Sequence, residues 1–243
     1  MLKILQAEYI KQSHSFEKNI IWLTPILALI ITTVLMAGIQ YAFSEALWNW
    51  WYSLYYQIML ALICYLNIKR EKKSKYFYLT SLPTSKSKLI IGKMLYISLL
   101  GLLSNLLVFI FTSIGGFIFT TTVPVSGALL TVLILTITSL WQIPLYLFLS
   151  IKFGLVITML TSFILTVSGT VIASSNKWIY FVSAIPMRVL TPVLRIIPNG
   201  LHLQPGSSFD NYRVLLYGIP VSMIWSILFV LLFIIWYSKT EQR

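Results

Sequence analysis

Chemistry on ATP would need a phosphate-binding loop, and only one short motif in the chain comes near to it. Such a loop reads Gly-x-x-x-x-Gly-Lys followed by Ser or Thr, because the backbone cradles phosphate and the hydroxyl binds magnesium. Gly92-Lys93-Met94 has the Gly-Lys pair but lacks the upstream glycine and the hydroxyl residue. The chain alone therefore cannot hydrolyse ATP by this route.

Side chains for acid–base, nucleophilic or metal chemistry are few and scattered. His14 and His202, the only histidines, lie outside the long apolar stretches, so an intramembrane serine has no base near it and a metalloprotease lacks ligands. The single cysteine, Cys64, cannot form a disulfide within one chain. We predict no catalytic, cofactor-binding or metal-binding residues. The six acidic residues also fall outside the apolar stretches, which disfavours ion-driven transport: Glu8, Glu17, Glu45, Glu71, Asp210 and Glu241.

The composition indicates that the elements that must position any functional residues lie in a lipid bilayer. Of the 243 residues, 58% are hydrophobic and 10% are charged, which is too apolar to cover a soluble globule of this size. The net charge of +12 is confined to segments between long apolar stretches. We interpret this charge as a determinant of membrane topology, and we predict no nucleic-acid binding.

Apolar runs long enough to cross a bilayer of about 30 Å as helices predict an all-α integral membrane protein with six transmembrane helices. The six predicted spans are Ile20–Tyr41, Trp51–Asn67, Met94–Phe119, Gly127–Ser150, Leu155–Ala173 and Val214–Tyr237. Tryptophans near their ends, including Trp22, Trp48 and Trp51, are typical of an aromatic belt at the membrane surface.

The distribution of Lys and Arg predicts that both termini are cytoplasmic, in a multi-pass protein of the cell membrane. Basic residues precede the first span and crowd the segment between the second and third, whereas the segments around Glu45 and around 121–126 have none. The long segment before the last span does carry Lys177, Arg188, Arg195 and Arg213, but long loops follow the charge rule poorly.

We expect a single transmembrane permease domain over residues 1–243. Its predicted parts are an interfacial helix (1–19), the first two spans (20–67), a cytoplasmic loop (68–93), three spans (94–173), an outer segment (174–213) and the last span with its tail (214–243). In the first part, Leu2, Leu5, Tyr9 and Phe16 share one helical face opposite three lysines, with Ile4 as an exception. This pattern is typical of an amphipathic helix on the inner membrane surface, although a solvated helix is the alternative.

The loop between the second and third spans combines a basic cluster with an aromatic patch and the break Leu82-Pro83. Pro83 disfavours helix at Leu82, and Ser85 can cap a helix that continues through Gly92 and Lys93 into the third span. This loop either docks a partner or uses its lysines to bind anionic lipid and fix orientation. In the outer segment, four prolines exclude one regular helix, and its apolar runs favour short helices that dip into the outer leaflet.

These features together resemble the type-2 ATP-binding-cassette exporter permeases: the surface helix, the loop that ends Leu-Pro-x-Ser and continues to Gly-Lys, the six spans and the broken outer segment. The resemblance covers nearly the whole chain. Two stretches resemble the lantibiotic-immunity permeases of Gram-positive bacteria, NWWYSLYYQIMLALICYLNIKREKKSKYFYLTSLP (Asn49–Pro83) and IPMRVLTPVLRIIPNGL (Ile185–Leu201).

The resemblance implies a permease that pairs with a second, related permease and with cytoplasmic ATPase subunits, which bind ATP and magnesium, and that removes a lantibiotic peptide from the membrane. It implies that the loop is a coupling helix contacting the ATPase through Lys72, Lys73, Tyr76, Tyr78, Leu82 and Pro83. It also implies a re-entrant outer segment that contains Pro186, Arg188, Pro192, Arg195, Pro198, Asn199 and Gly200.

Two other functions remain open at this point. The membrane subunit of a vitamin-uptake transporter can also have six spans and many aromatic residues, although the long basic loop and the surface helix argue against it. A sensor or scaffold that signals antimicrobial stress without transport is the other alternative, and it predicts no efflux from reconstituted vesicles even when the ATPase turns over.

Overall fold

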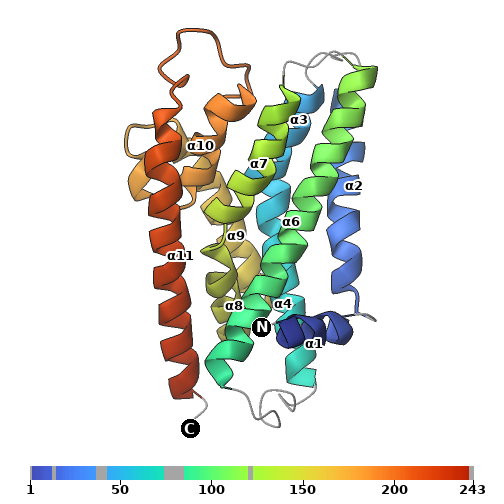
Figure 1. The fold of residues 1–243 in the computed structure, drawn as a ribbon, viewed down its shortest axis with the longest axis vertical. Helices are drawn as coiled ribbons and strands as arrows, with labels where there is room; N and C mark the ends of the chain where they lie inside the picture. The colour runs from blue at the N-terminus through green and yellow to red at the C-terminus, as the bar shows by residue number, and fades with distance from the viewer. Residues whose placement is uncertain (1, 13–14, 37–42, 74–84, 120–122, 241–243) are drawn as a thin grey trace.

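The computed structural model describes residues 2–12, 15–36, 43–73, 85–119 and 123–240. Over these residues the chain is helical, with no β-strand. Long helices run side by side along the long axis of the molecule, and short helices and turns lie at its ends (Figure 1). This is the all-α architecture predicted from the sequence.

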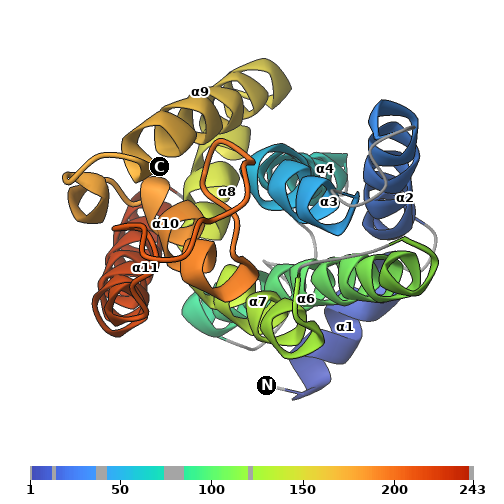
Figure 2. The same ribbon diagram turned by 90° about the horizontal axis from the view of Figure 1, so that it is seen from above.

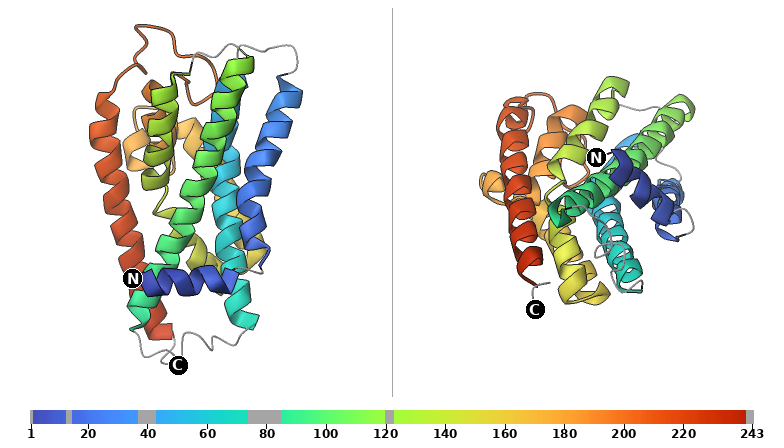
Figure 3. Two further views of the ribbon diagram at one scale, coloured as in Figure 1. Left: turned by 45° about the vertical axis from the view of Figure 1, so that its right-hand side comes forward. Right: turned by 60° about the horizontal axis from the view of Figure 1, so that its bottom comes forward.

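The first part of the chain contains a helix that lies across the bundle and helices that run along it. The crosswise helix is α1 (Leu2–Gln12), and it packs against α6 (Figure 3). It is followed by α2 (Glu17–Leu35) and by one continuous helical path, which consists of α3 (Phe43–Trp50), the π-helical turn η2 (Trp51–Tyr55) and α4 (Tyr56–Lys73).

The remaining helices complete the bundle. The long helix α6 begins at Lys86, directly after Ser85, as predicted, but the Ser85 side chain forms no capping hydrogen bond. The elements after Ser85 are α6 (Lys86–Ile118), α7 (Val125–Thr138), α8 (Gln142–Lys152), α9 (Leu155–Ala173), the 3-10 turn η3 (Trp178–Tyr180), α10 (Ala184–Leu194) and α11 (Arg213–Thr240).

Four described helices are long and apolar enough to cross a membrane: Glu17–Leu35, Ser87–Ile118, Leu155–Ala173 and Arg213–Lys239. A fifth span is possible if α7 and α8 act as one, but these helices are bent by 47° to each other. The predicted span Gly127–Ser150 is therefore not one regular helix. Pro144 explains the break, because it cannot donate a hydrogen bond to the carbonyl of Leu140 and its ring would clash with that carbonyl in a continuous helix.

The predicted span Trp51–Asn67 lies within the longer path α3–η2–α4. Because this helix begins at Phe43, Glu45 is buried in its first turn and does not lie in an outer loop. Trp48 and Trp51 are fully buried inside the bundle, so for these two residues the aromatic-belt interpretation was wrong. Trp22 is 54% exposed and fits that interpretation.

The molecule has two distinct ends. The end that carries α1, the last residues of α4, the first residues of α6 and the last residues of α11 is called the basic end below (Figures 1 and 3). The other end carries the start of α3, helix α10 and residues 195–212. Seen from that end, α10 lies between α7, α9 and α11 (Figure 2).

Candidate functional site

The Gly92-Lys93 pair, which first suggested phosphate chemistry, contributes to helix packing. Gly92 lies where α1 crosses α6, and a Cβ atom at this position would collide with Cγ2 of Ile4. Ile4 is the apolar residue that departed from the predicted amphipathic face of α1. Lys93, on the next position of α6, forms a buried ion pair with Glu71 of α4. Glycine allows α1 to approach closely, and the lysine joins α6 to α4.

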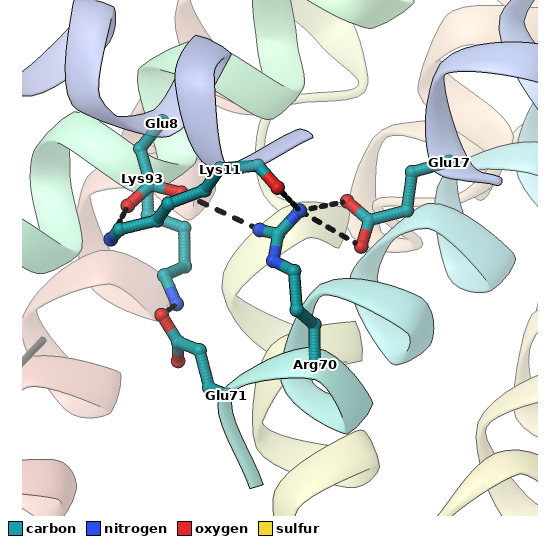
Figure 4. Close-up of polar contacts among 6 residues, drawn as sticks. All are labelled: Glu8, Lys11, Glu17, Arg70, Glu71 and Lys93. Carbon is teal, nitrogen blue, oxygen red and sulfur yellow. Dashed lines mark hydrogen bonds and ion pairs between the residues drawn. The ribbon is translucent and has the colours of Figure 1, made fainter. Parts of the chain in front are cut away.

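Arg70, near the end of α4, is the centre of a second set of contacts, which bind α1 and α2 (Figure 4). Its Nη1 lies 3.2 Å from each carboxylate oxygen of Glu17 and donates a hydrogen bond to the carbonyl oxygen of Lys11 at 3.5 Å. Its Nη2 lies 3.8 Å from Oε2 of Glu8. Glu8 also accepts a hydrogen bond from Nζ of Lys11 at 2.6 Å. The last turn of α1 is thereby attached to α4.

These side chains form one buried group of charges, the ion cluster, composed of Glu8, Lys11, Glu17, Arg70, Glu71 and Lys93. The side chains of Glu17 and Lys93 are only 2% and 6% exposed. A buried charge is tolerated when partners compensate it, and removal of one partner destabilises strongly. The three carboxylates and three cations of the cluster balance each other in charge. Because they come from α1, α2, α4 and α6, their ion pairs hold these four helices in fixed relative positions at the basic end.

The ion cluster adjoins the segment predicted to contact an ATPase. Residues 74–84 connect Lys73, the last residue of α4, to the start of α6, so both flanking helices are held by the cluster. Lys72 donates a hydrogen bond to the carbonyl oxygen of Ile151 at 3.0 Å, which satisfies an unpaired group at the end of α8. Lys73 is exposed. Tyr76, Tyr78, Leu82 and Pro83 lie outside the described residues.

At the opposite end, α10 is embedded in the bundle, and every residue of this helix except Arg188 is buried. Three glycines on neighbouring helices allow the close packing. A Cβ atom at Gly127 of α7 would lie 2.5 Å from the carbonyl oxygen of Val193, and one at Gly169 of α9 would lie 2.7 Å from that of Ser183. A Cβ atom at Gly218 of α11 would collide with Val189. Helix α10 is thus a tightly packed element of the core.

The predicted outer-segment residues have different environments. Pro186 and Pro192 are buried within α10, and Pro198 is buried in the turn that follows it. The guanidinium of Arg188 is half-buried and lies 4.1 Å from the ring centroid of Phe209. Burial lowers the pKa of Arg188, although a guanidinium stays protonated near neutral pH.

The two stretches that carry the lantibiotic-immunity resemblance touch each other just after the end of α10. Arg195 is exposed and adopts a left-handed conformation (φ 58°), which ends α10. Asn199 caps the following turn, since its Oδ1 accepts a hydrogen bond from the amide of Leu201 at 3.2 Å. Gly200 lies against Asn49, because a Cβ atom here would be 3.1 Å from Oδ1 of Asn49. The start of the first stretch therefore meets the end of the second.

A hydrogen-bonded group inside the bundle was not predicted from the sequence. Nε1 of Trp51 donates to Oδ1 of Asn105 at 2.8 Å, and Nδ2 of Asn105 donates to Oγ1 of Thr136 at 2.9 Å. These contacts connect η2, α6 and α7. The signal in the sequence was Asn105 itself, an amide within an apolar run where an unsatisfied polar group is expensive.

The ion cluster was also missed, and its signal was weaker. The sequence places the acidic members outside the apolar stretches and gives no sign of their partners, but opposite charges at four helix ends on the same side of the bundle can meet. Among the described residues no group of three His, Cys, Asp or Glu side chains could hold a metal ion. The arrangement fixes the relative positions of α1, α2, α4 and α6 at the basic end.

A bundle of apolar helices, whose basic end is held together by buried ion pairs, is the structure of a multi-pass membrane protein. The chain belongs to the family of ABC-2 family transporter proteins, which matches residues 16–203. Membership makes it a membrane component of an ABC transporter, in which a separate subunit hydrolyses ATP. No curated protein sequence and no solved structure resembles the chain significantly.

Proposed function

We propose that the chain is the permease subunit of an ATP-driven exporter, that its basic end faces the cytoplasm, and that residues 74–84 dock the ATPase. The observation that supports this most directly is the buried ion cluster, which joins the two helices flanking this segment to α1 and α2. A displacement of residues 74–84 by the ATPase would then move the ends of α1, α2, α4 and α6 together. The excess of lysine and arginine at the basic end fits a cytoplasmic orientation.

The proposed permease has six spans, with α3–η2–α4 as the second. Helix α2 starts at the basic end and runs toward the opposite end, whereas α6 starts again at the basic end (Figure 1). The chain must therefore return between them. The continuous helical segments of 8, 5 and 18 residues are long enough for a bilayer core of about 30 Å at about 1.5 Å per residue.

The docking role is tested by substituting Leu82 and Pro83 with Ala in the permease–ATPase complex. We expect less ATPase to copurify with the permease and less stimulation of its turnover. Lys177→Ala, an exposed change at the opposite end, is the matched control. Full copurification with normal stimulation in the Leu82 and Pro83 variants would reject residues 74–84 as the docking segment.

We further propose that the substrate is a lantibiotic or a similar antimicrobial peptide, which the permease removes from the membrane together with a second, related permease. Support comes from the stretches Asn49–Pro83 and Ile185–Leu201, which resemble lantibiotic-immunity permeases. The two stretches also touch in the structure, where Gly200 lies against Asn49. The embedded helix α10 and the turn after it would form the re-entrant exit side.

The substrate proposal is tested by deleting the gene in its host and measuring susceptibility to a panel of lantibiotics. We expect higher susceptibility to at least one of them, restored by the intact gene but not by a variant that no longer binds the ATPase. Unchanged susceptibility, in a host shown to express the protein beforehand, would rule out immunity as the function.

A further inference from the structure

We propose a binding site for an anionic phospholipid between α8 and α11 at the basic end. An apolar cavity of about 320 Å³ lies between the two helices. Its walls include Leu145 and Phe148 of α8 and Phe229, Leu232, Phe233 and Trp236 of α11. This inference does not rest on the exporter function, because it needs only a multi-pass protein in a bilayer.

The cavity has the size and position expected for part of one acyl chain. Its volume is at the lower end of the roughly 300–1,000 Å³ found for small-molecule sites. Helix α8 has 11 residues and is therefore about 16 Å long at about 1.5 Å per residue. That length corresponds to one leaflet of a hydrocarbon core of about 30 Å. A lipid tail can thus follow α8 from the membrane surface into the groove.

A lysine ammonium group lies where the groove reaches the basic end. Nζ of Lys152, the last residue of α8, lies 5.8 Å from the ring centroid of Phe148 and 5.3 Å from that of Phe153. The Phe148 ring lines the cavity and packs edge-on against Trp236 at 4.7 Å between centroids. Nζ of Lys72 bonds to the neighbouring carbonyl of Ile151. The Lys152 ammonium group therefore lies beside a ring that lines the groove, and Lys72 is attached to the residue that precedes Lys152.

An acidic headgroup suits these ammonium groups better than a protein helix does. Over the described part of the chain, neither Lys72 nor Lys152 forms an ion pair with a carboxylate. Lysine ammonium groups bind lipid phosphate as point charges, and each adds about 1 kcal/mol of attraction to an anionic surface. A phosphate at Lys152, with its tail along Phe148 and Phe233, satisfies both the charge and the apolar wall.

The test uses the purified full chain, delipidated in mild detergent and incubated with phosphatidylglycerol or phosphatidylcholine, with retained lipid counted by native mass spectrometry. We expect preferential retention of phosphatidylglycerol. Lys152→Ala should weaken that retention about fivefold, the factor expected per lysine at an anionic surface, and Lys152→Glu should abolish the preference. Lys177→Ala, at the opposite end, is the matched control and should retain wild-type binding.

A second variant tests the apolar wall separately. Leu232→Trp, at an exposed position on the groove, should reduce retention of both lipids, with an unchanged elution profile as proof of folding. Equal retention of the two lipids by the wild type, or a preference for phosphatidylglycerol that survives Lys152→Glu in a folded protein, would overturn the proposal. Disulfide crosslinking of Leu232→Cys between two copies in membranes would also overturn it, since a second chain would then occupy the groove.

Discussion

Arg70 is the residue on which the contacts of the basic end converge. Its guanidinium reaches Glu8, Glu17 and the carbonyl oxygen of Lys11, so one side chain contacts both α1 and α2 from α4. A planar guanidinium with several fixed donors can serve three acceptors at once, whereas a lysine ammonium acts as a point charge. The shape of arginine, and not only its charge, therefore matters at this position.

Replacement of Arg70 by Ala should destabilise the protein by about 3–5 kcal/mol, because it leaves the buried carboxylate of Glu17 without its paired cation, while Glu8 keeps Lys11. Arg70→Lys should give an intermediate loss, and adding Glu17→Gln to Arg70→Ala should recover part of it. Thermal unfolding of the detergent-purified protein, followed by size-exclusion chromatography, measures these changes. Arg213→Ala, at an exposed position at the other end, is the control. Equal stability of Arg70→Ala and the control would mean that the cluster contributes nothing.

At the same scale, Gly92 should not tolerate a side chain. Gly92→Val would collide with Ile4, and overpacking of this kind costs about 1–3 kcal/mol. We expect a lower unfolding temperature and faster proteolysis within residues 2–12 as α1 is displaced. Ile4→Ala in the same chain should restore protection, and Ile4→Ala alone is the reference. If Gly92→Val leaves proteolysis unchanged, α1 does not depend on this contact.

Among the helices, the junction of α4 and α6 is the element that a docked ATPase would move. Glu71 and Lys93 form a buried ion pair across this junction, on either side of residues 74–84. Because contacts in a packed bundle shift together, a change in the spacing of α4 and α6 also displaces α1 and α2 through Arg70. The ion pair is therefore well placed to transmit ATPase closure.

Charge reversal of this pair tests the transmission. Glu71→Lys or Lys93→Glu alone places like charges together inside the bundle and should reduce both stability and substrate-stimulated ATP turnover. The double swap should recover both, with an interaction energy of about 1–3 kcal/mol in the stability cycle. Lys88→Glu, at an exposed position on α6, should behave like the wild type. A double swap no better than either single change would exclude a direct functional pairing.

The sequence predicted the elements better than the contacts between them. Length and apolarity located the long helices, and Ser85 correctly marked the start of α6. The break after α7 could also have been predicted, because Pro144 lies in the middle of the run assigned to one span. The ion cluster could not, since Glu17 and Arg70 are 53 residues apart and only the packing of α2 on α4 brings them together. In the sequence, a charged residue near the end of a span looks the same whether it is buried or solvated, and only the packing of the helices distinguishes the two.

For the whole molecule, the number of spans follows from which end each helix enters. Lys3, Lys88 and Lys177 are exposed, and they lie in α1, in the first turn of α6 and just before η3. Six spans with a cytoplasmic basic end require Lys3 and Lys88 to share the inner side and Lys177 to face outward. If α3–η2–α4 did not cross the membrane, α1 and the start of α6 would have to lie on opposite sides.

Single cysteines at these positions distinguish the two topologies. The native Cys64 is buried and is replaced by Ala in all variants to give a silent background. In intact cells a membrane-impermeant maleimide should label Lys177→Cys, whereas Lys3→Cys and Lys88→Cys should react only after the membrane is permeabilised. Labelling of Lys88→Cys but not Lys3→Cys in intact cells would show that α3–η2–α4 does not cross the membrane. Labelling of Lys3→Cys and Lys88→Cys in intact cells, with Lys177→Cys protected, would instead show that the basic end faces outward. Residues 74–84 would then be out of reach of any cytoplasmic ATPase.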